Sequence, residues 1–523
     1  MTPRPRWDLG ARISALGKSS CVSTAIGAGV LIVLFTIHLV PSTWTGNEIG
    51  YFDLAHRWVN PDAFGDLHAA KDASIARLLS FLVMGAGVLI LGMEPAFAAF
   101  GLAALVATPL SFVWLARRMR VDLLAAALAL IVFFAFGQSL VGAAFMFGTV
   151  EPKTFAYILV MIGLGLAFSD RRVAAMGVGS AATYFHFLIG GFWAVAMLGL
   201  FVLKDQNMRS CGRMLGILVA ATLPLLVAII WERSGVPPDS SQFALNTIYA
   251  EYRVPHHIAP FVQARTFYAD WLGGLVLHAV LAATFTVQAC RSGAAARPIS
   301  IWIAGLNGYI LGAALIAFLD RNTHTLSILY LFRPSGLILL LTLLSASKWA
   351  IHAAGPALRG ISQIALIAWL SVHFGLFSYA ASYLFRGHQP LVAMLTPTEA
   401  DMVEWVKAHT SPDAVVVIEP LSEQRFLGEG DGVWAGMERL LNRPTLVNFK
   451  FNPTDKSDLH RWYILLQWRQ ALFSGECALI HAQPVDYLIV RQAETEARLT
   501  ACTKSVWRGD GLSILRPYPD AAL

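Results

Sequence analysis

A stretch rich in ionisable side chains follows the first long apolar run of the sequence. It reads GNEIGYFDLAHRWVNPDAFGDLHAAKDA, residues 46–73, and holds five acids and two histidines. If the stretch begins as a helix, Glu48 and Tyr51 share one side, while Asp53 pairs with Arg57 four positions later. Glu48 is then the acid without a local partner. Such a carboxylate could act as a general base toward a hydroxyl group, or it could simply be solvated.

Three more acids of the same stretch, Asp62, Asp66 and Asp72, could offer oxygen ligands to a divalent metal ion. Their spacing matches no metal-binding motif, so solvated loop acids are the simpler interpretation. The sequence therefore permits a divalent metal without requiring one, and it leaves the cofactor unknown.

Two other segments carry cations that could contact a phosphate group. Lys153, in GTVEPKTFAYILV, follows Glu151 by two positions, so a surface ion pair or a lysine that extends to the membrane interface is the alternative. Arg333, in YLFRPSGLILLL, is the only Lys, Arg, Asp or Glu from residue 322 to residue 347. An arginine at a membrane boundary is a candidate for function, although its side chain can also extend to the interface.

Histidines accompany further cations. IYAEYRVPHHIAPF, residues 248–261, holds Arg253, His256 and His257, which form a cationic or a metal-binding group depending on their protonation. Adjacent histidines project differently and rarely bind one ion together, so contact with an anion or interfacial packing is the preferred interpretation. His186, in TYFHFLIGG, lies between two short apolar segments, where a lone histidine is more often structural.

The composition indicates which elements must position these side chains. Of the 523 residues, 56% are hydrophobic and 14% are charged, whereas soluble domains average about 45–50% and 25%. Apolar segments of membrane-spanning length recur as far as residue 384. The sequence therefore predicts a mainly α polytopic membrane domain, residues 1–386, with about eleven transmembrane helices: 21–41, 95–115, 121–138, 154–169, 173–188, 190–204, 213–231, 271–290, 299–319, 327–347 and 361–384.

The positions of Lys and Arg predict the orientation. Arg4, Arg6, Arg12 and Lys18 precede the first span, which is too long for an ordinary signal peptide, so we expect an uncleaved helix with a cytoplasmic N-terminus. If the additional apolar run 75–92 crossed the membrane, every later basic connection would lie outside. We therefore expect that run to lie along the outer interface or to re-enter. The connections that then face the cytoplasm are ARRMR, SDRR, KDQNMRSCGR, CRSGAAAR and the segment 348–359.

The remaining residues, 387–523, are predicted to form a small α/β domain on the outer side. They hold 13 of the 39 Lys and Arg but 17 of the 33 Asp and Glu. The segment TPTEADMVEWVKAHTSPDAVVVIEP predicts a helix that opens with Thr396, Pro397 and Glu399 in capping-box order, followed by a strand. PTLVNFKF, PVDYLIV and GLSILR are predicted as further strands and SDLHRWYILLQWRQALF as a second helix.

Aromatic and sulfur-containing side chains of this domain suggest two further roles. Trp434, Trp462 and Trp468 could stack on sugars, although core positions are preferred for the last two, which share a predicted helix. Cys477 and Cys502 could form a disulfide if the domain lies in an oxidising compartment. The sequence alone does not show that their Cβ atoms meet.

Several classes of protein are disfavoured. The pI near 9.1 comes from single basic residues between apolar runs rather than from a basic stripe, so no nucleic-acid partner is expected. The sequence contains no Gly-rich phosphate loop, nucleophile elbow or CxxC pair, which argues against an ATPase, a serine hydrolase or a thiol oxidoreductase.

In the predicted topology, Glu48 and the basic side chains lie together on the outer face among apolar helices. This combination suits a lipid-phosphate substrate, because the cations can neutralise the phosphate and the helices can contact the lipid. Glu48, Tyr51 and Ala55, in NEIGYFDLA, resemble the acidic motif that opens the first outer loop of the GT-C superfamily of polyprenyl-phosphate-dependent glycosyltransferases. That motif often reads Asp-Glu, then Tyr, then Ala, and Asn47 replaces its first acid here. The superfamily includes protein O-mannosyltransferases, the lipid A aminoarabinose transferase and oligosaccharyltransferases, and it places interfacial helices in this loop. EPKTFAY, RVPHH and LFRPS are similar to segments of less-characterised bacterial members.

The resemblance implies a glycosyltransferase of the bacterial inner membrane. It would move a sugar, with inversion, from an undecaprenyl-phosphate-type carrier to a glycan, lipid or protein acceptor on the periplasmic side. Glu48 would be the catalytic base, with Asp53 as the alternative. The residues expected to contact the substrate are Tyr51, Lys153, His186, Arg253, His256, His257 and Arg333.

Two other functions fit a polytopic protein with boundary charges. A transporter or lipid flippase would show ionisable residues deep within several helices and pseudo-symmetry between two halves, and the sequence shows little of either. A glycan polymerase or ligase would use a diphosphate-linked donor.

Overall fold

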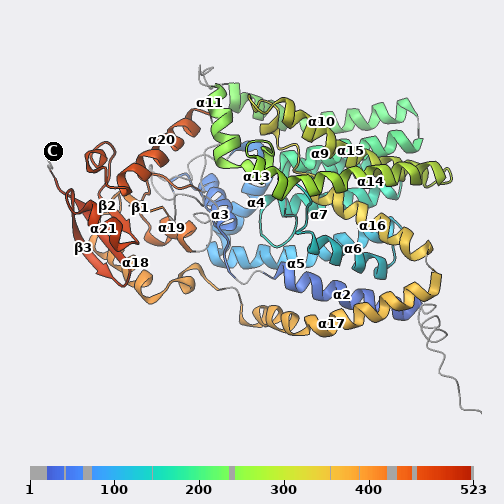
Figure 1. Ribbon diagram of the computed structural model, residues 1–523, viewed down its shortest axis with the longest axis horizontal. Helices are drawn as coiled ribbons and strands as arrows, with labels where there is room; N and C mark the ends of the chain where they lie inside the picture. The colour runs from blue at the N-terminus through green and yellow to red at the C-terminus, as the bar shows by residue number, and fades with distance from the viewer. Residues whose placement is uncertain are drawn as a thin grey trace, which may run out of the picture.

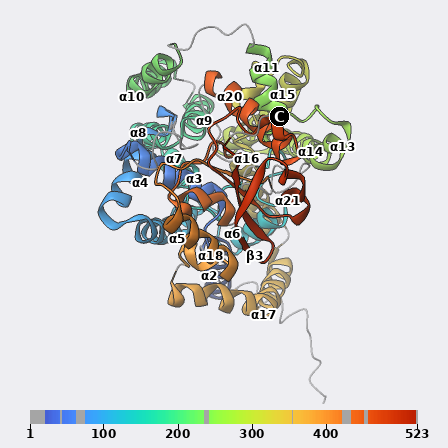
Figure 2. The same cartoon turned by 90° about the vertical axis from the view of Figure 1, so that its left-hand side faces the viewer.

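The computed structural model describes residues 20–40, 43–62, 74–143, 145–205, 207–234, 242–353, 355–387, 389–420, 433–449 and 456–519. Apolar helices run along the long axis of the molecule, and a small sheet lies at one end of them (Figure 1). Viewed from that end, the sheet and its helices lie in front of the bundle (Figure 2). The predicted fold class, a mainly α membrane protein with a small C-terminal α/β region, is confirmed.

Each of the eleven predicted spans corresponds to a helix. Within the described ranges, eight helices are long and apolar enough to cross a membrane, and α6 and α7 are shorter apolar helices. The chain is therefore a polytopic membrane protein by helix length and composition, while the number of crossings stays a prediction. The helices are α2 (Ser20–Leu39), α5 (Met93–Arg118), α6 (Leu123–Ala135), α7 (Pro152–Phe168), α8 (Arg172–Phe185), α9 (Phe187–Asp205), α10 (Met208–Ser234), α14 (Leu272–Arg291), α15 (Arg297–Leu319), α16 (Ser335–Ala353) and α17 (Gly355–Arg386).

One predicted span begins in a different place. Helix α16 starts at Ser335 rather than at residue 327, because the preceding residues form a short 3₁₀ helix, η4 (Ser327–Leu329), and Tyr330 then adopts a left-handed conformation with φ of 54°. Pro334, which has no backbone N–H to continue a helix, completes the break. Arg333 consequently lies in the turn before α16 and not within the helix.

The segment predicted not to cross the membrane forms η1 (Ile75–Arg77) and α4 (Leu78–Leu91). Helix α4 packs against α3 (Gly46–Val59), and the contact is so close that a Cβ at Gly85 would lie 2.5 Å from the carbonyl oxygen of Ala55. Its 14 residues span about 21 Å, less than the roughly 30 Å of hydrocarbon. Since α6 and α8 are equally short, length alone does not decide whether α4 crosses, and the expectation remains a prediction.

The C-terminal region contains a four-stranded sheet in the order β1-β2-β4-β3, in which β1 and β2 are parallel and β4 is antiparallel to both of its neighbours. The described elements of this region are η5 (Leu391–Met394), α18 (Pro397–His409), β1 (Val416–Ile418), η6 (Val433–Gly436), α19 (Met437–Leu441), α20 (Lys456–Phe473), η7 (Cys477–Leu479), β2 (Tyr487–Val490), α21 (Ala493–Leu499), β3 (Thr503–Gly509) and β4 (Leu512–Pro517).

Five of these elements match the prediction. The capping box of α18 is present, since the Thr396 hydroxyl accepts from the backbone N–H of Glu399 and the Glu399 carboxylate accepts from that of Thr396. Helix α20 and strands β1, β2 and β4 are also confirmed. The strand predicted at PTLVNFKF is wrong for its described residues, because only Thr445 pairs there, in an isolated bridge to Val416.

A hydrophobic core shared by two regions holds the sheet against the bundle. Trp44 lies two residues before α3, and Ile49 and Phe52 lie within it. All three belong to the same buried cluster as Met437 of α19 and Ile489 of β2. A separate core within the C-terminal region includes Trp462 and Trp468, both buried, as predicted for core residues. Helix α3 is therefore fixed between the membrane helices and the sheet (Figure 1).

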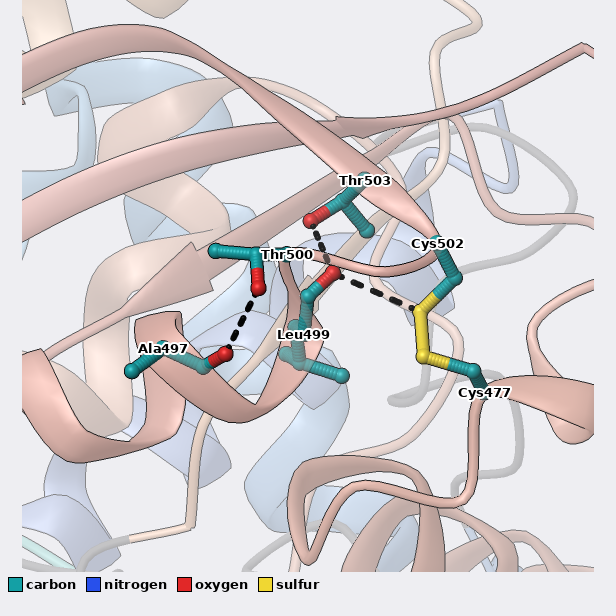
Figure 3. Close-up of a disulfide and its surroundings, with 6 residues drawn as sticks. All are labelled: Cys477, Ala497, Leu499, Thr500, Cys502 and Thr503. Carbon is teal, nitrogen blue, oxygen red and sulfur yellow. Dashed lines mark hydrogen bonds between the residues drawn. A yellow bond between two sulfur atoms is a disulfide. The ribbon is translucent and has the colours of Figure 1, made fainter.

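The structure joins Cys477 to Cys502, with 5.6 Å between their Cα atoms (Figure 3). The bond ties η7 to the start of β3, beside the Leu499 carbonyl at the end of α21, which accepts from the Thr503 hydroxyl. The disulfide that the sequence permitted is thus formed, and it closes a loop that contains β2 and α21.

Candidate functional site

Glu48 occupies the third position of α3 and completes a capping box with Thr45. The Thr45 hydroxyl accepts from the Glu48 N–H at 3.4 Å, and Glu48 Oε2 accepts from the Thr45 N–H at 2.9 Å. Glu48 Oε1 accepts from the N–H of Val150 at 2.6 Å. The expectation that Glu48 has no local partner is therefore wrong. The spacing Thr-x-x-Glu is a readable capping signal, and the cap fixes where the carboxylate points.

Burial dominates the acidity of Glu48, whose side chain is 1% exposed. Removal from water raises its pKa to about 7, although the N–H groups of Val150 and Thr45 favour the ionised form and oppose the rise. The negative charge of Glu151 adds to the increase. A carboxyl group with this pKa can accept a proton near neutral pH.

Lys153 lies in a buried ion pair at the beginning of α7. Its Nζ is 3.0 Å from Glu151 Oε2, and the other oxygen of Glu151 accepts from the Asn47 side-chain amide at 3.0 Å. Both members are almost fully buried, so the pair is not the surface pair considered from the sequence. Burial alone would raise the pKa of Glu151, but Lys153 and Asn47 outweigh it and lower that pKa. Asn47, the residue before Glu48, thus donates a hydrogen bond to a second acid, Glu151.

Three arginines approach one group of tyrosines from different elements. Arg77 of η1 lies over the ring of Tyr51, 5.2 Å from its centroid, and Arg333 lies over Tyr330 at 4.7 Å. The Tyr330 hydroxyl is 2.6 Å from the hydroxyl of Tyr249. Tyr249 belongs to a π-helical turn, η2 (Ile248–Arg253).

The third arginine is Arg253, at the end of that turn. It and Arg77 both interact electrostatically with Tyr51, Tyr249 and Tyr330. Arg77 also lies close enough to Glu151 to feel its charge. The three arginines thereby join the Glu151–Lys153 pair in one assembly, which we call the outer site: Glu48, Tyr51, Arg77, Glu151, Lys153, Arg253, His257, Tyr330 and Arg333.

The predicted histidines lie at or beside the outer site. His257, in α12 (Pro255–Ile258), has its Nδ1 2.7 Å from the Gly142 carbonyl oxygen, and the tilted ring of His256 lies beside it with 4.1 Å between ring centroids. Burial, followed by the charges of Arg333 and His256, lowers the pKa of His257 well below its usual value. A neutral ring can donate or accept a hydrogen bond without adding charge. His186, buried between α8 and α9, lies within electrostatic reach of Arg333 and Lys153.

Asp53 pairs with an arginine outside this group. Its Oδ1 is 2.7 Å from Arg439 Nη2 of α19, and the Arg439 Nε also donates to it, at 2.8 Å. The pairing with Arg57 expected from helical spacing is therefore wrong, because tertiary contact with α19 brings a buried guanidinium closer. Burial raises the pKa of Asp53 to about 6, and Arg439 opposes that rise.

The outer site thus contains Glu48 and five of the seven predicted substrate contacts, namely Tyr51, Lys153, Arg253, His257 and Arg333, while His186 and His256 lie beside it. Asp53 is paired with Arg439 instead, and the roles of all these residues stay predictions. Sequence reasoning missed two arginines. Arg77 is the single charge at the start of the apolar run 75–92, a signal similar to that of Arg333. Nothing local to Arg439 indicated its partner, because the two residues of that pair are 386 positions apart.

No cluster of three or more His, Cys, Asp or Glu side chains that could hold a metal ion occurs in the part of the chain that the structure describes. Asp62 is described and exposed, whereas Asp66 and Asp72 lie outside the described residues. A divalent metal therefore stays an open possibility.

Comparisons with known proteins give similarities of overall structure only. No protein-family model matches the sequence, and no curated protein matches it either. The structure of ArnT from Cupriavidus metallidurans bound to undecaprenyl phosphate aligns with 95% of this chain and 98% of its own, at 14% identity and a TM-score of 0.49. The same protein in the apo state aligns with 94% of this chain and 97% of its own, at 12% identity and a TM-score of 0.39.

A third similar structure comes from an archaeon. It is the oligosaccharyltransferase AglB from Archaeoglobus fulgidus, in complex with an inhibitory peptide and a dolichol-phosphate. It covers 95% of this chain and 74% of its own, at 12% identity and a TM-score of 0.49. At these values the similarities assign neither a family nor an activity, and the interpretation of this chain depends on its own side chains.

Proposed function

We propose that this protein is a membrane glycosyltransferase that takes a sugar from a polyprenyl-phosphate carrier, as the resemblance to the GT-C superfamily implies. The observation that carries the proposal is the outer site itself. It combines a buried carboxyl group whose pKa is about 7 with four basic side chains at one end of a bundle of apolar helices. The basic residues are Arg77, Lys153, Arg253 and Arg333.

The cations suit the phosphate of a lipid donor. Four positive charges face only two acids, Glu48 and Glu151, so the outer site favours an anion. As the bond between the sugar anomeric carbon and the phosphate oxygen breaks, the electron pair leaves with that oxygen and its negative charge grows. Fixed guanidinium and ammonium groups in a buried site stabilise this developing charge. The prenyl chain would remain among the apolar helices.

Glu48 would supply the base. An acceptor hydroxyl attacks the anomeric carbon from the side opposite the phosphate, the new carbon–oxygen bond forms, and the hydroxyl proton passes to the Glu48 carboxylate. The displacement inverts the anomeric configuration. Neutral His257 and the hydroxyls of Tyr249 and Tyr330 would orient the donor. Asp53 remains the alternative base, but its ion pair with Arg439 favours a positioning role.

The orientation proposed for this activity is a cytoplasmic N-terminus and a periplasmic C-terminal domain, residues 387–523, in a bacterial inner membrane. Two features support it. The basic connections contact one another and therefore lie at the same end of the bundle. Lys348 Nζ donates to the Met119 carbonyl of the segment ARRMR at 3.0 Å, and Lys204 Nζ donates to Asp170 of the segment SDRR at 2.6 Å. The disulfide of Cys477 and Cys502 suits an oxidising compartment for the other end.

A purified-protein assay tests the proposal directly. The protein in detergent or lipid discs is incubated with a panel of polyprenyl-phosphate sugars, and the free polyprenyl phosphate is measured. We expect release from at least one donor once an acceptor extract of the cell envelope is added. Release only from diphosphate-linked donors would instead favour a glycan polymerase or ligase, and release from none, with divalent metal present, would favour a transporter.

A further inference from the structure

A pair of side chains outside the outer site joins two of the segments that form it. Glu251 lies in the π-helical turn η2, which ends with Arg253. His324 lies in the connection between α15 and α16, residues 320–334, which we call the α15–α16 loop and which also carries Arg333. His324 Nε2 is 2.9 Å from Glu251 Oε1, although the two residues are 73 positions apart in the sequence. The contact therefore fixes one segment of the outer site against another.

The carboxylate of Asp320 shapes the α15–α16 loop. It accepts five hydrogen bonds, which come from the backbone N–H groups of residues 325–327 and from the hydroxyls of Thr323 and Ser327. Burial would raise the pKa of Asp320, but hydrogen bonds of this set outweigh it and lower that pKa to about 2. The carboxylate is therefore ionised at neutral pH, and it holds the backbone around His324 in one conformation.

His324 has a strained backbone. Its φ of 50° lies in the left-handed region, which residues other than glycine rarely adopt. The ring is 2% exposed, and its Nδ1 makes no hydrogen bond within the part of the chain that the structure describes. Among the described residues, Glu251 is thus the hydrogen-bond partner of the ring. A strained residue persists where its surroundings fix it, and here the result is a ring directed at η2.

Two further contacts hold η2 along the α15–α16 loop. The side-chain amide of Asn246, two residues before η2, donates to the carbonyl of Thr323 at 3.1 Å. The hydroxyl of Tyr249 lies 2.6 Å from that of Tyr330. Together with the carboxylate–imidazole pair, these are three side-chain contacts between the two segments. The position of η2 relative to the loop is therefore specified at several points.

The two segments differ in what else holds them. The α15–α16 loop is tied to the membrane helices, since the carbonyl of Leu331 accepts from the hydroxyl of Tyr309 in α15 at 2.9 Å. The turn η2 instead lies between this loop and the C-terminal region, where Arg253 lies over the ring of Phe449, 5.1 Å from its centroid. The distance between Arg253 and Arg333 consequently depends on how η2 is held against the loop.

We propose that Asp320, His324 and Glu251 are positioning residues, which together set the separation of Arg253 and Arg333 around the phosphate of the lipid donor. The inference rests on the proposed function, because it takes that phosphate as the ligand of the two arginines. A hydrogen bond from a guanidinium group to a phosphate oxygen is about 2.7–2.9 Å long. If η2 shifts by about 1 Å, one of the two arginines can no longer keep this distance to the phosphate that the other holds.

The test measures the binding of a lipid phosphate without any sugar. The probe is undecaprenyl phosphate, and its Kd is measured by microscale thermophoresis with the full-length protein in detergent. Glu251→Ala removes a carboxylate whose side chain is 39% exposed, so it leaves no buried cavity. We expect this variant to raise Kd about threefold to tenfold. Glu404→Ala, which removes an exposed carboxylate from its pair with Lys407, is the matched control and should leave Kd unchanged.

Double variants separate a positioning role from a general loss of structure. In an Arg253→Gln background, Glu251→Ala should change Kd by less than about twofold, because the arginine that it positions is already absent. In an Arg77→Gln background, Glu251→Ala should still raise Kd about threefold to tenfold, because Arg77 lies in η1, which this pair does not contact. Loosened structure would have the same effect in both backgrounds.

Variants of the other two residues give independent measurements. His324→Asn keeps a residue that tolerates a positive φ but removes the ring that reaches Glu251, so it should raise Kd as Glu251→Ala does. Asp320→Asn removes the charge that holds the loop, and it should raise Kd at least as much. The thermal unfolding temperature of each variant is measured first, so that only folded variants are compared.

Three results would overturn the proposal: no binding of undecaprenyl phosphate by the parent, an unchanged Kd in Glu251→Ala, or an equal effect of Glu251→Ala in the Arg253→Gln and Arg77→Gln backgrounds. The assay requires no turnover. A parent that binds undecaprenyl phosphate but releases none from any sugar donor would contradict the proposed transferase and leave the positioning role intact.

Discussion

Arg439 of α19 and Asp53 of α3 form a buried ion pair, with 2.7 Å between Arg439 Nη2 and Asp53 Oδ1. The Arg439 guanidinium also lies over the ring of Trp44, 4.7 Å from its centroid, and donates to the carbonyl of Ile49. These contacts fix the C-terminal region to the helix that carries Glu48. The orientation of the candidate base therefore depends on a residue almost 400 positions away.

Removing one member of this pair should destabilise the protein. Asp53→Asn leaves a charged guanidinium buried without its counter-ion, which costs about 3–5 kcal/mol and lowers the thermal unfolding temperature in detergent. The double variant Asp53→Asn with Arg439→Gln should lose less free energy of unfolding than the two single variants lose in sum. Lys407→Ala, which removes an exposed pair with Glu404, should cost at most about 1 kcal/mol.

The coupling between Asp53 and Arg439 should also depend on pH. Burial raises the pKa of Asp53 to about 6, so the carboxyl group is ionised above that pH and takes a proton below it. The interaction energy from the double-mutant cycle should accordingly be larger at pH 8 than at pH 5. An energy independent of pH would show that the charge of Asp53 contributes little.

Neutralising the arginines of the outer site should weaken donor binding. A hydrogen bond to a charged group contributes about 1.5–3 kcal/mol, so Arg77→Gln and Arg333→Gln should each raise KM for the lipid donor roughly tenfold to a hundredfold. Arg321→Gln alters an exposed arginine just after α15 and serves as the matched control. If all three variants change KM equally, the outer site is not the phosphate site.

Loss of the disulfide should destabilise the C-terminal region. Cys477 and Cys502 are 25 positions apart, and a loop of that size corresponds to about 3.5 kcal/mol in the chain-entropy treatment. Cys477→Ser, made together with Cys502→Ala, should therefore unfold at a lower temperature than the parent. Dithiothreitol should lower the unfolding temperature of the parent but leave that of the double variant unchanged.

The proposed orientation predicts which ends of the protein can be labelled from outside the cell. In a chain with Cys21 and Cys290 replaced by serine, Asp510→Cys, in the β3–β4 turn, should react with a membrane-impermeant maleimide added to spheroplasts. Arg118→Cys, at the end of α5, should react only after the membrane is permeabilised. Ready labelling at position 118 would reverse the topology and remove the outer site from the periplasmic face.

Local patterns in the sequence predicted the parts of the fold that local physics determines. Runs of apolar residues predicted eleven helices, and Thr396 with Glu399 predicted the start of α18. The start of α16 was missed because a left-handed Tyr330 lies inside an uninterrupted apolar pattern. Strand β3, which pairs with the predicted strand β4, was also missed, although the Asp510-Gly511 turn between them, with φ of 70° at Gly511, carries a recognisable signal.

The sequence predicted some members of the candidate site, but not Arg77, Tyr330 or the contacts between its residues. Lys153, Arg253 and Arg333 stand out because charges are rare in apolar surroundings, and the structure brings them together. Helical spacing predicted a pair of Asp53 with Arg57, which is wrong, because spacing indicates only which residues are neighbours within one helix. The contact with Arg439 depends on how the C-terminal region packs against α3, which no local pattern of the sequence encodes.

The rate of polyprenyl phosphate release as a function of pH, measured for the parent and for Glu48→Gln, tests the central claim most directly. A base must be ionised to accept the proton, and burial raises the pKa of Glu48 to about 7, so the parent should reach a plateau above that pH and fall to about one tenth of it at pH 6. On the plateau, Glu48→Gln should be slower than the parent by about 10²–10⁴-fold, and this ratio should shrink toward pH 6 because the rate of the variant does not follow the ionisation of Glu48. Thr45→Ala keeps the carboxylate but removes a hydroxyl that lowers the pKa of Glu48, so its profile should keep the shape of the parent's with a midpoint at higher pH. A Glu48→Gln variant that keeps the parent's rate and pH profile would contradict the assignment of Glu48 as the base.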